Sequence, residues 1–264
     1  DLKQLPAVVT QSPELSATKD EKLEGIGLHD MRNSFFERLF LQCDKNGWTW
    51  AFDRLSHQGR MHEDIMQFPN ENFYQGHLKI LPEEIAYRAT QQQPLDSESV
   101  TNKKNIVEDL SKNRVLFLPS KEDMDDGFKK TNKFEAGQIV DLVGDFNLIF
   151  KQMNLKASIG IITPYRAQIA LITDYLSKAN LLTEDLSIDT VERYQGSSRD
   201  VILISLCTNT DSQLASMTSL MDDGTDRKLN VALTRARHHM VVVGCPEMLK
   251  GNILYEKFME RYKK

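Results

Sequence analysis

The sequence predicts an α/β fold in which a doubly wound, mainly parallel β-sheet carries helices on both faces. Two observations lead to this fold class. Short, nearly continuous apolar runs recur between residues 115 and 243, and segments with apolar residues at helical spacing lie between them. Continuous apolar runs are typical of parallel strands buried on both faces, and their alternation with helices is typical of doubly wound domains.

Five of the runs are rich in apolar and β-branched residues and are expected to form strands. In chain order they are Val115–Leu118, Ile159–Thr163, Ile188–Val191, Val201–Leu206 and Met240–Val243. A turn or a polar segment separates each run from the amphipathic stretch that follows it, which is the pattern of strands joined through helices.

Helices are expected where apolar residues recur every three or four positions. Ile139–Phe150 and Ile169–Ala179 lie between strands, Met31–Leu41 precedes them, and Glu247–Lys264 ends the chain with a last helix despite Gly251. These segments supply the helical layers of the predicted fold.

Two polar stretches interrupt this pattern. Ser12–Gly25 is expected to be mostly loop with a short turn of helix, and Thr90–Asn105 is poor in apolar residues and is expected to be a mobile loop.

Composition describes an ordinary globular protein. The chain has 264 residues, of which 40% are hydrophobic and 27% charged, so it can bury a core in one large domain or two small ones. No apolar run approaches the roughly 20 residues that span a bilayer, so no membrane partner is expected. The net charge of −5 does not indicate a nucleic-acid binder, but a groove that holds a strand needs only a local basic stripe.

The cysteines indicate neither a metal site nor a disulfide framework. Cys43, Cys207 and Cys245 are far apart and form no CxxC pair. Cys207 and Cys245 follow apolar strand runs and are expected to be buried thiols. A reducing, intracellular compartment is expected, either the cytoplasm or, in a eukaryote, the nucleus.

A complete phosphoryl-transfer site is missing from the sequence. No GxxxxGK[ST] phosphate loop occurs, and the chain contains no Gly-Lys dipeptide. No predicted strand ends in the Asp-Glu pair that would hold Mg²⁺ and a hydrolytic water. We therefore expect this chain to hydrolyse no ATP by itself.

Six other segments form a recognisable series. They are Asp1–Val9 (DLKQLPAVV), Met31–Phe40, Arg60–Tyr74, Ile159–Gln168 (IGIITPYRAQ), Thr190–Asp200 (TVERYQGSSRD) and Leu229–Arg237 (LNVALTRAR). In this order they resemble the motifs of the superfamily 1B helicases, the branch that includes the nonsense-mediated-decay helicase and senataxin. Several motifs in one order are far more specific than any one of them.

The resemblance implies a RecA-like domain that lacks the phosphate loop. In this family ATP lies between two RecA-like domains, and the first supplies the phosphate loop and the carboxylates that hold Mg²⁺. Residues 1–30 are expected to be the end of that first motor domain and a linker, and residues 31–264 the second. The rest of the first domain is expected upstream of Asp1.

The resemblance also implies which residues contact ATP. By motif position Arg60 and Arg235 look like the arginines that touch the γ-phosphate, Gln4 like its sensor, and Gly196 like a further ATP contact. A guanidinium placed there neutralises charge on the departing phosphoryl group, an effect of roughly 10³–10⁵ in rate. Arg235 lies in a segment with helical spacing before the strand run His239–Gly244, at an edge of the predicted sheet.

The alternative role for Arg60 and Arg235 is an ordinary ion pair. Arg237 is expected to be structural and to pair with an acidic neighbour.

A second group of residues is implied to hold a single strand of DNA or RNA. Thr163, Pro164, Tyr165 and Arg166 end one predicted strand and open a helix, and Thr190 ends another. Hydroxyl and backbone N–H groups at such positions can meet phosphate without reading sequence. The alternative is that Tyr165 packs at the sheet edge and Arg166 is a solvated helix residue.

Two departures from the family pattern bear on nucleotide selection. Gly59 stands where the family often has a tyrosine near the base, and Ser198 replaces an acidic residue that can bond the ribose. Both weaken recognition of the base and sugar, whereas the γ-phosphate arginines are retained.

The function expected from these observations is that of the second motor domain of an ATP-dependent helicase or translocase, moving 5′ to 3′ as that branch does. One alternative is a RecA-like module that binds nucleic acid or protein without turnover. Another is an unrelated doubly wound nucleotide-binding protein, which the missing glycine-rich turn after the first strand disfavours.

Overall fold

The computed structural model describes residues 1–6, 12–82, 90, 95, 105–124, 130–220 and 224–263. The chain divides into two compact units, Asp1–Ser56 and His57–Lys264. The boundary expected after residue 30 falls inside the first of these units. The loop expected over residues 90–105 lies outside the described residues, apart from its residues 90, 95 and 105, as does the 7–9 part of the first motif segment.

The first unit is built from short helices. They are α1 (Pro13–Ser16), α2 (Glu21–Gly25), α3 (Phe35–Lys45) and the 3₁₀ turn η1 (Thr49–Ala51). α3 begins later than the predicted Met31 because Ser34 caps it, its side chain accepting a hydrogen bond from the Glu37 N–H. The stretch 12–25, expected to be mostly loop, contains α1 and α2.

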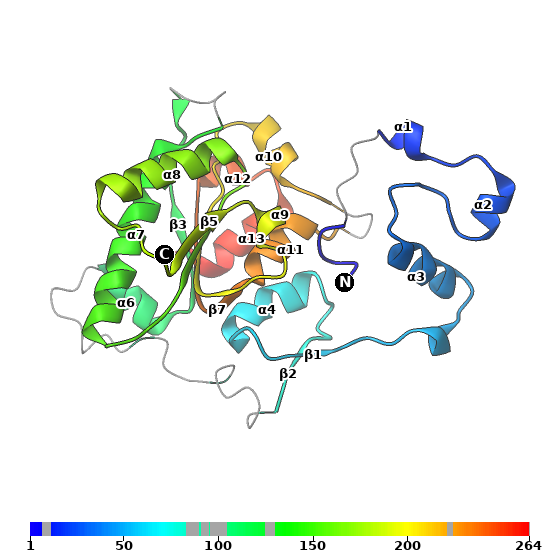
Figure 1. Ribbon diagram of the computed structural model, residues 1–264, viewed down its shortest axis with the longest axis horizontal. Helices are drawn as coiled ribbons and strands as arrows, with labels where there is room; N and C mark the ends of the chain where they lie inside the picture. Colours follow the sequence, from blue (N-terminus) through cyan, green and yellow to red (C-terminus); the bar gives the residue numbers. More distant parts are fainter. Residues whose placement is uncertain are drawn as a thin grey trace. The chain divides into compact units, whose positions relative to one another are not determined.

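A five-stranded, wholly parallel sheet organises the second unit (Figure 1). Its strands are β3 (Val115–Pro119), β4 (Ile159–Ile162), β5 (Leu186–Asp189), β6 (Arg199–Ser205) and β7 (Ala236–Gly244). They lie in the order β3-β7-β6-β4-β5. The predicted doubly wound fold is confirmed. A separate parallel pair, β1 (His57–Gln58) and β2 (Lys79–Ile80), was not predicted.

Helices cover both faces of this sheet, as Figure 1 shows. One face packs against α6 (Asn105–Lys112), α7 (Lys133–Gln152) and α8 (Arg166–Lys178), which share one buried core with the inward residues of the strands. The elements on the other side are α4 (Glu63–Asn72), α9 (Val191–Tyr194), α10 (Asp211–Met217), α11 (Arg227–Leu233), α12 (Pro246–Leu249) and α13 (Ile253–Tyr262).

Alternate residues of the strands serve the two faces. Ile161 and Leu203 belong to the core beneath α7 and α8. Ile162 and Ile204 instead line a small space with Leu229 of α11 and Tyr255 of α13. Burial on both faces explains why the strand runs contain so few polar residues.

Several element boundaries differ from the prediction. β5 begins at Leu186 and ends at Asp189, so Val191 opens α9 instead of ending a strand. The predicted C-terminal helix is two helices, because the Asn252 side chain caps α13 by accepting a hydrogen bond from the Leu254 N–H. Gly251 lies in the break between them.

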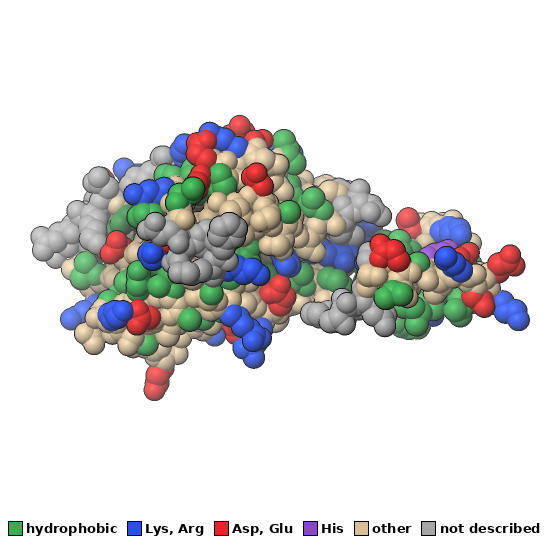
Figure 2. Space-filling view, turned by 90° about the horizontal axis from the view of Figure 1, so that it is seen from above, with side chains coloured by type: hydrophobic (Ala, Val, Ile, Leu, Met, Phe, Trp, Pro, Cys, Tyr) green, Lys and Arg blue, Asp and Glu red, His purple; other side chains and the backbone are tan. Residues whose placement is uncertain are grey.

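Charge is mixed on the surface. In the view of Figure 2, basic and acidic side chains are interspersed over the second unit. Within the described part of the chain, no helix has the length and apolar character that crossing a membrane requires.

Candidate functional site

Two guanidinium groups meet at Thr234. Arg235 is 1% exposed, and its Nε donates to the Val231 carbonyl oxygen at 3.0 Å while its Nη2 donates to Thr234 Oγ1 at 2.9 Å. Arg60 comes from the loop before α4, and its Nη1 donates to the Thr234 carbonyl oxygen at 3.1 Å. Arg60 and Thr234 lie 174 positions apart in the sequence, and Thr234 joins the two arginines.

The local backbone explains where Arg235 lies. Asp226 caps the start of α11, and the helix ends at Leu233 with Thr234 as its C-cap. The prediction that Arg235 lies in a helical segment is wrong, because Arg235 follows the C-cap and directly precedes β7. The strand begins earlier than predicted because the Arg235 carbonyl already accepts a hydrogen bond from the Arg199 N–H of β6.

The electrostatic setting of this pair is unusual. Burial, followed by the nearby Arg60, lowers the pKa of Arg235 to about 10. Burial, followed by Arg237, also lowers the pKa of Arg60. Neither arginine forms an ion pair with any described residue. Buried cations are costly unless they are paired, so the site favours an anion from outside these residues.

Arg237 behaves as predicted. Its Nη1 lies 3.4 Å from Asp200 Oδ1 in an ion pair, and its Nε donates to Ser198 Oγ at 3.2 Å. Ser198, which replaces the acidic residue of the family pattern, therefore contacts this arginine.

Two residues of this site were missed by sequence reasoning. Thr234 links Arg60 to Arg235 with its carbonyl and its hydroxyl. Tyr74 lies close enough to influence the pKa of both arginines, and its hydroxyl accepts a hydrogen bond from Asn230 Nδ2 at 3.0 Å. Both stand inside motif segments, but a hydroxyl leaves no periodic signal that would single it out.

Gly196 lies at the same end of the sheet, just before β6. It is exposed and has φ +88°, a conformation that favours glycine. Gln4 belongs to the first unit, where its N–H donates to the Asp1 carbonyl at 3.2 Å.

The residues expected to hold a strand lie at the opposite end of the sheet. Ile162 and Asp189 are register partners at the carboxyl ends of β4 and β5, so Thr163 and Thr190 follow them side by side. The Thr163 N–H donates to the Asp189 carbonyl at 3.2 Å. Thr163 Oγ1 is buried without a hydrogen-bond partner among the described residues. Thr190 caps α9 without a side-chain hydrogen bond.

Tyr165 and its neighbours open α8. Tyr165 Oη lies 3.0 Å from Ser216 Oγ and donates to the Gln213 carbonyl at 3.3 Å, while Lys130 Nζ lies 5.3 Å from its ring centroid. The ring is thus held against α10, where the alternative to strand binding had placed it at the sheet edge. Pro164 is half-buried, whereas Arg166 is exposed at the first residue of the helix.

Apart from Gln4, the predicted site residues lie at the two ends of the parallel strands. Arg60, Arg235 and Gly196 lie where β6 and β7 begin, and Thr163 and Thr190 lie where β4 and β5 end. In most doubly wound proteins a nucleotide lies at the carboxyl ends. The arginines instead lie at the amino ends of β6 and β7.

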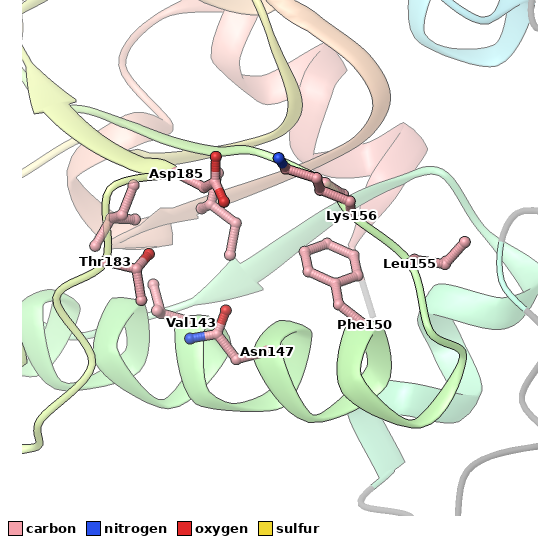
Figure 3. Close-up of a pocket in the computed structure, with 10 residues that line it drawn as sticks. Val143, Asn147, Phe150, Leu155, Lys156, Thr183 and Asp185 are labelled. Atoms are coloured by element: carbon pink, nitrogen blue, oxygen red, sulfur yellow. The ribbon is translucent and has the colours of Figure 1, made fainter.

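A separate pocket of about 240 Å³ contains none of the predicted residues. Figure 3 shows Val143, Asn147 and Phe150 rising into it from α7, with Lys156 and Asp185 at its rim. It lies at the starts of β4 and β5, on the face that α7 covers.

Comparison with known proteins assigns the family. A family model described as an AAA domain matches residues 31–247. The chain belongs to this family. Helicase sen1 of Schizosaccharomyces pombe is 29% identical over 86% of this chain and 12% of its own length. DNA polymerase alpha-associated DNA helicase A of Saccharomyces cerevisiae is 28% identical over 98% of this chain and 36% of its own.

These relatives confirm the resemblance to the superfamily 1B helicases, and the chain spans about a third or less of their length. Among solved structures, the C-terminal domain of a possible DNA helicase from Lactobacillus plantarum matches 74% of this chain and 95% of that one, with 11% identity and a TM-score of 0.37.

Proposed function

We propose that this chain supplies the second motor domain of an ATP-dependent helicase or translocase acting on single-stranded DNA or RNA. The observation that carries the proposal is the pair of guanidiniums at Thr234. Arg60 and Arg235 come from distant segments, are desolvated together, and have no acidic partner among the described residues.

The donors left over by this pair suit a phosphate. Nη1 of Arg235 and both Nε and Nη2 of Arg60 donate to no described residue. Thr234 meanwhile holds both side chains in place, so little reorganisation is needed when an anion arrives. We assign these donors to the γ-phosphate of ATP, where they would stabilise charge as the phosphoryl group leaves.

The remainder of the nucleotide site would come from a first motor domain. Within the described residues, no cluster of three or more His, Cys, Asp or Glu side chains could hold a metal ion. The Mg²⁺ ligands and the phosphate loop are therefore assigned to that upstream domain. Gln4 of this chain is proposed to sense the γ-phosphate. Gly196 would let the backbone approach the nucleotide closely.

The other end of the sheet is proposed to hold the strand. The hydroxyls of Thr163 and Thr190 lie there without a hydrogen-bond partner among the described residues, and Arg166 adds an exposed positive charge. Pro164 and Tyr165 shape the entry to α8. Such contacts address the sugar-phosphate backbone and are indifferent to sequence.

ATP hydrolysis by the full-length protein, with and without single-stranded DNA or RNA, tests the proposal. We expect stimulation by at least one strand type, and the result would also show whether the protein acts on DNA or on RNA. The isolated 264-residue chain should show no turnover, because it carries half of the site. Turnover by a clean preparation of that chain would contradict the split site, and no turnover by the full protein with any strand would favour the non-catalytic binding module.

A further inference from the structure

A buried polar network lies beneath the proposed strand-binding end of the sheet. Its centre is Glu135 in the first turn of α7, whose side chain is 0% exposed. Glu135 Oε2 accepts hydrogen bonds from Ser205 Oγ at 2.7 Å and from the Cys207 backbone N–H at 2.8 Å. A buried carboxyl is costly unless its bonds are made, so these contacts hold the end of β6 in one arrangement.

The first branch of the network reaches α8. Gln168 Nε2 donates to Ser205 Oγ at 3.1 Å and to the Asn132 carbonyl at 3.0 Å, and Gln168 Oε1 accepts from the Asn132 N–H at 2.8 Å. Gln168 lies in the first turn of α8, two residues after Arg166. Asn132 in turn caps α7 by accepting the Glu135 N–H at 2.9 Å. Glu135 is thereby connected to the helix start that follows the Thr163–Tyr165 segment.

The second branch returns to Tyr165. Asn132 Nδ2 donates to Asn209 Oδ1 at 2.8 Å, and the Asn209 N–H donates to Gln213 Oε1 at 2.7 Å. The Gln213 carbonyl accepts the Tyr165 hydroxyl. The polar contacts therefore approach Tyr165 from two sides, through α8, of which it is the N-cap, and through its hydroxyl, which bonds residues of α10.

The backbone at Cys207, which bonds Glu135, has an uncommon conformation. Its φ is +48°, a left-handed conformation that residues other than glycine seldom adopt. The bond from its N–H to Glu135 favours this conformation just beyond the end of β6.

We propose that Glu135 is a positioning residue for strand binding, which fixes Ser205 and Cys207 and, through Gln168 and Asn132, the Thr163–Arg166 segment. The inference rests on the proposed function, because it assigns a second layer behind the proposed strand contacts. Glu135 would act on strand binding and not on ATP, because the arginines assigned to the γ-phosphate lie at the other end of the strands.

The test is strand-stimulated ATP hydrolysis by the full-length protein carrying Glu135→Gln. The amide keeps the shape of the side chain, and its oxygen can take the place of Oε2. Its NH2 group then replaces Oε1, which is buried without a hydrogen-bond partner among the described residues. We expect the half-saturating strand concentration to rise about tenfold, the effect of leaving one buried donor without an acceptor. The KM for ATP and the kcat at saturating strand should stay within about twofold, because the arginine end is untouched.

Glu256→Gln is the matched control. Glu256 also stands in the first turn of a helix, α13, but its side chain makes no hydrogen bond or ion pair with a described residue. All its kinetic constants should equal those of the wild type. Should Glu135→Gln fail to fold, Ser205→Ala removes the two contacts of Ser205 Oγ with Glu135 and Gln168 and should also raise the half-saturating strand concentration.

Two results would overturn the inference. One is an unchanged half-saturating strand concentration in Glu135→Gln. The other is an equal loss in the ATP and strand constants, which indicates a general structural role. Failure of the proposed function has a different signature, since the wild-type protein would then show no stimulation by any strand.

Discussion

Arg235 packs its guanidinium against the helix that precedes it, using Nε and Nη2 on Val231 and Thr234. These two bonds need the planar fork of arginine, because a lysine ammonium on a flexible stem cannot make both and still present a donor outward. The loss of solvation lowers its pKa to about 10, which leaves the group charged near neutral pH. The residue is therefore a fixed, permanently positive donor.

Arg235→Ala in the full-length protein should lower kcat by about 10³-fold or more, and Arg235→Lys by at least about 10²-fold, if the fork is what the phosphate meets. Nucleotide affinity should change by only a few fold, because the upstream domain is proposed to bind most of the nucleotide. Steady-state kinetics and nucleotide titration measure the two quantities. Arg261→Ala is the control, since Arg261 pairs with Glu71 near the surface. A parallel loss of nucleotide affinity would assign Arg235 a structural role.

Glu135 gives a pH-dependent stability whose sign follows from its burial. Burial raises the pKa of its carboxyl from 4.5 to about 7, so between these values the folded chain retains a proton that the unfolded chain has lost. The free energy of unfolding therefore falls as pH rises through this window and levels off above it. We expect Glu135→Gln to remove this fall, a relative change of about 3 kcal/mol at most.

Denaturant unfolding of both proteins from pH 5 to 8 measures this difference. The titratable neighbours of the site, Cys207 and Asp123, are the same in both proteins, and burial raises the pKa of the Cys207 thiol, which stays neutral throughout. Parallel stability profiles for the two proteins would show that Glu135 does not titrate in this range.

At the residue scale, sequence reasoning succeeded where a motif carried the residue. Arg60 and Arg235 were named from motif position, and the structure brings them to one threonine. The network around Glu135 and Gln168 was missed, because amides and carboxyls that bond one another across the fold leave no local spacing to detect. Thr234 and Tyr74 were missed for the same reason.

At the scale of elements, all five strands of the main sheet were predicted, but most of their ends were not, the starts of β3 and β4 excepted. Hydrophobic periodicity reports the buried centre of a strand, whereas its ends depend on bonds to neighbouring strands. β7 extends back to Ala236 because β6 pairs with it through Arg199. The order of the strands and the short β1–β2 pair also depend on contacts far apart in sequence.

Gly160 in β4 offers a test of how tightly one strand is packed. A Cβ there would lie 2.4 Å from Tyr194 Oη, 2.8 Å from Ile202 Cδ1 and 2.9 Å from Arg199 Cγ. Gly160→Ala should therefore lower the free energy of unfolding by about 1–3 kcal/mol, the usual cost of overpacking.

Gly137→Ala is the matched control for Gly160→Ala. Gly137 lies in α7 with nothing within 4 Å of an added Cβ, so alanine should raise stability by up to about 1 kcal/mol through helix propensity. Denaturant midpoints of the two variants should move in opposite directions. Equal midpoints would show that β4 and α9 part readily enough to admit a methyl group.

At the scale of the whole molecule, the described core belongs to one unit. Every buried apolar side chain among the described residues lies between Met61 and Met259, inside the unit His57–Lys264. The first unit instead exposes large apolar groups, including Trp50 at 82% and Leu55 at 99%.

A chain of residues 57–264 should therefore fold without residues 1–56. We expect a cooperative thermal transition within a few degrees of that of the 264-residue chain, because the buried apolar area that stabilises folding is retained. The far-ultraviolet circular dichroism of the shorter chain should be that of a folded α/β domain. Loss of cooperativity in the shorter chain would show that the first 56 residues contribute to the core.

The separation of the two ends of the sheet has a pharmacological consequence. β6 alone runs from Arg199, bonded to Arg235, to Ser205 beneath the proposed strand contacts, a span of about 20 Å. A compound that occupies the arginine end of the complete protein is therefore expected to leave the nucleic acid in place. The proposed motor would then stall on the bound strand, whereas a compound bound at Thr163 would displace the strand.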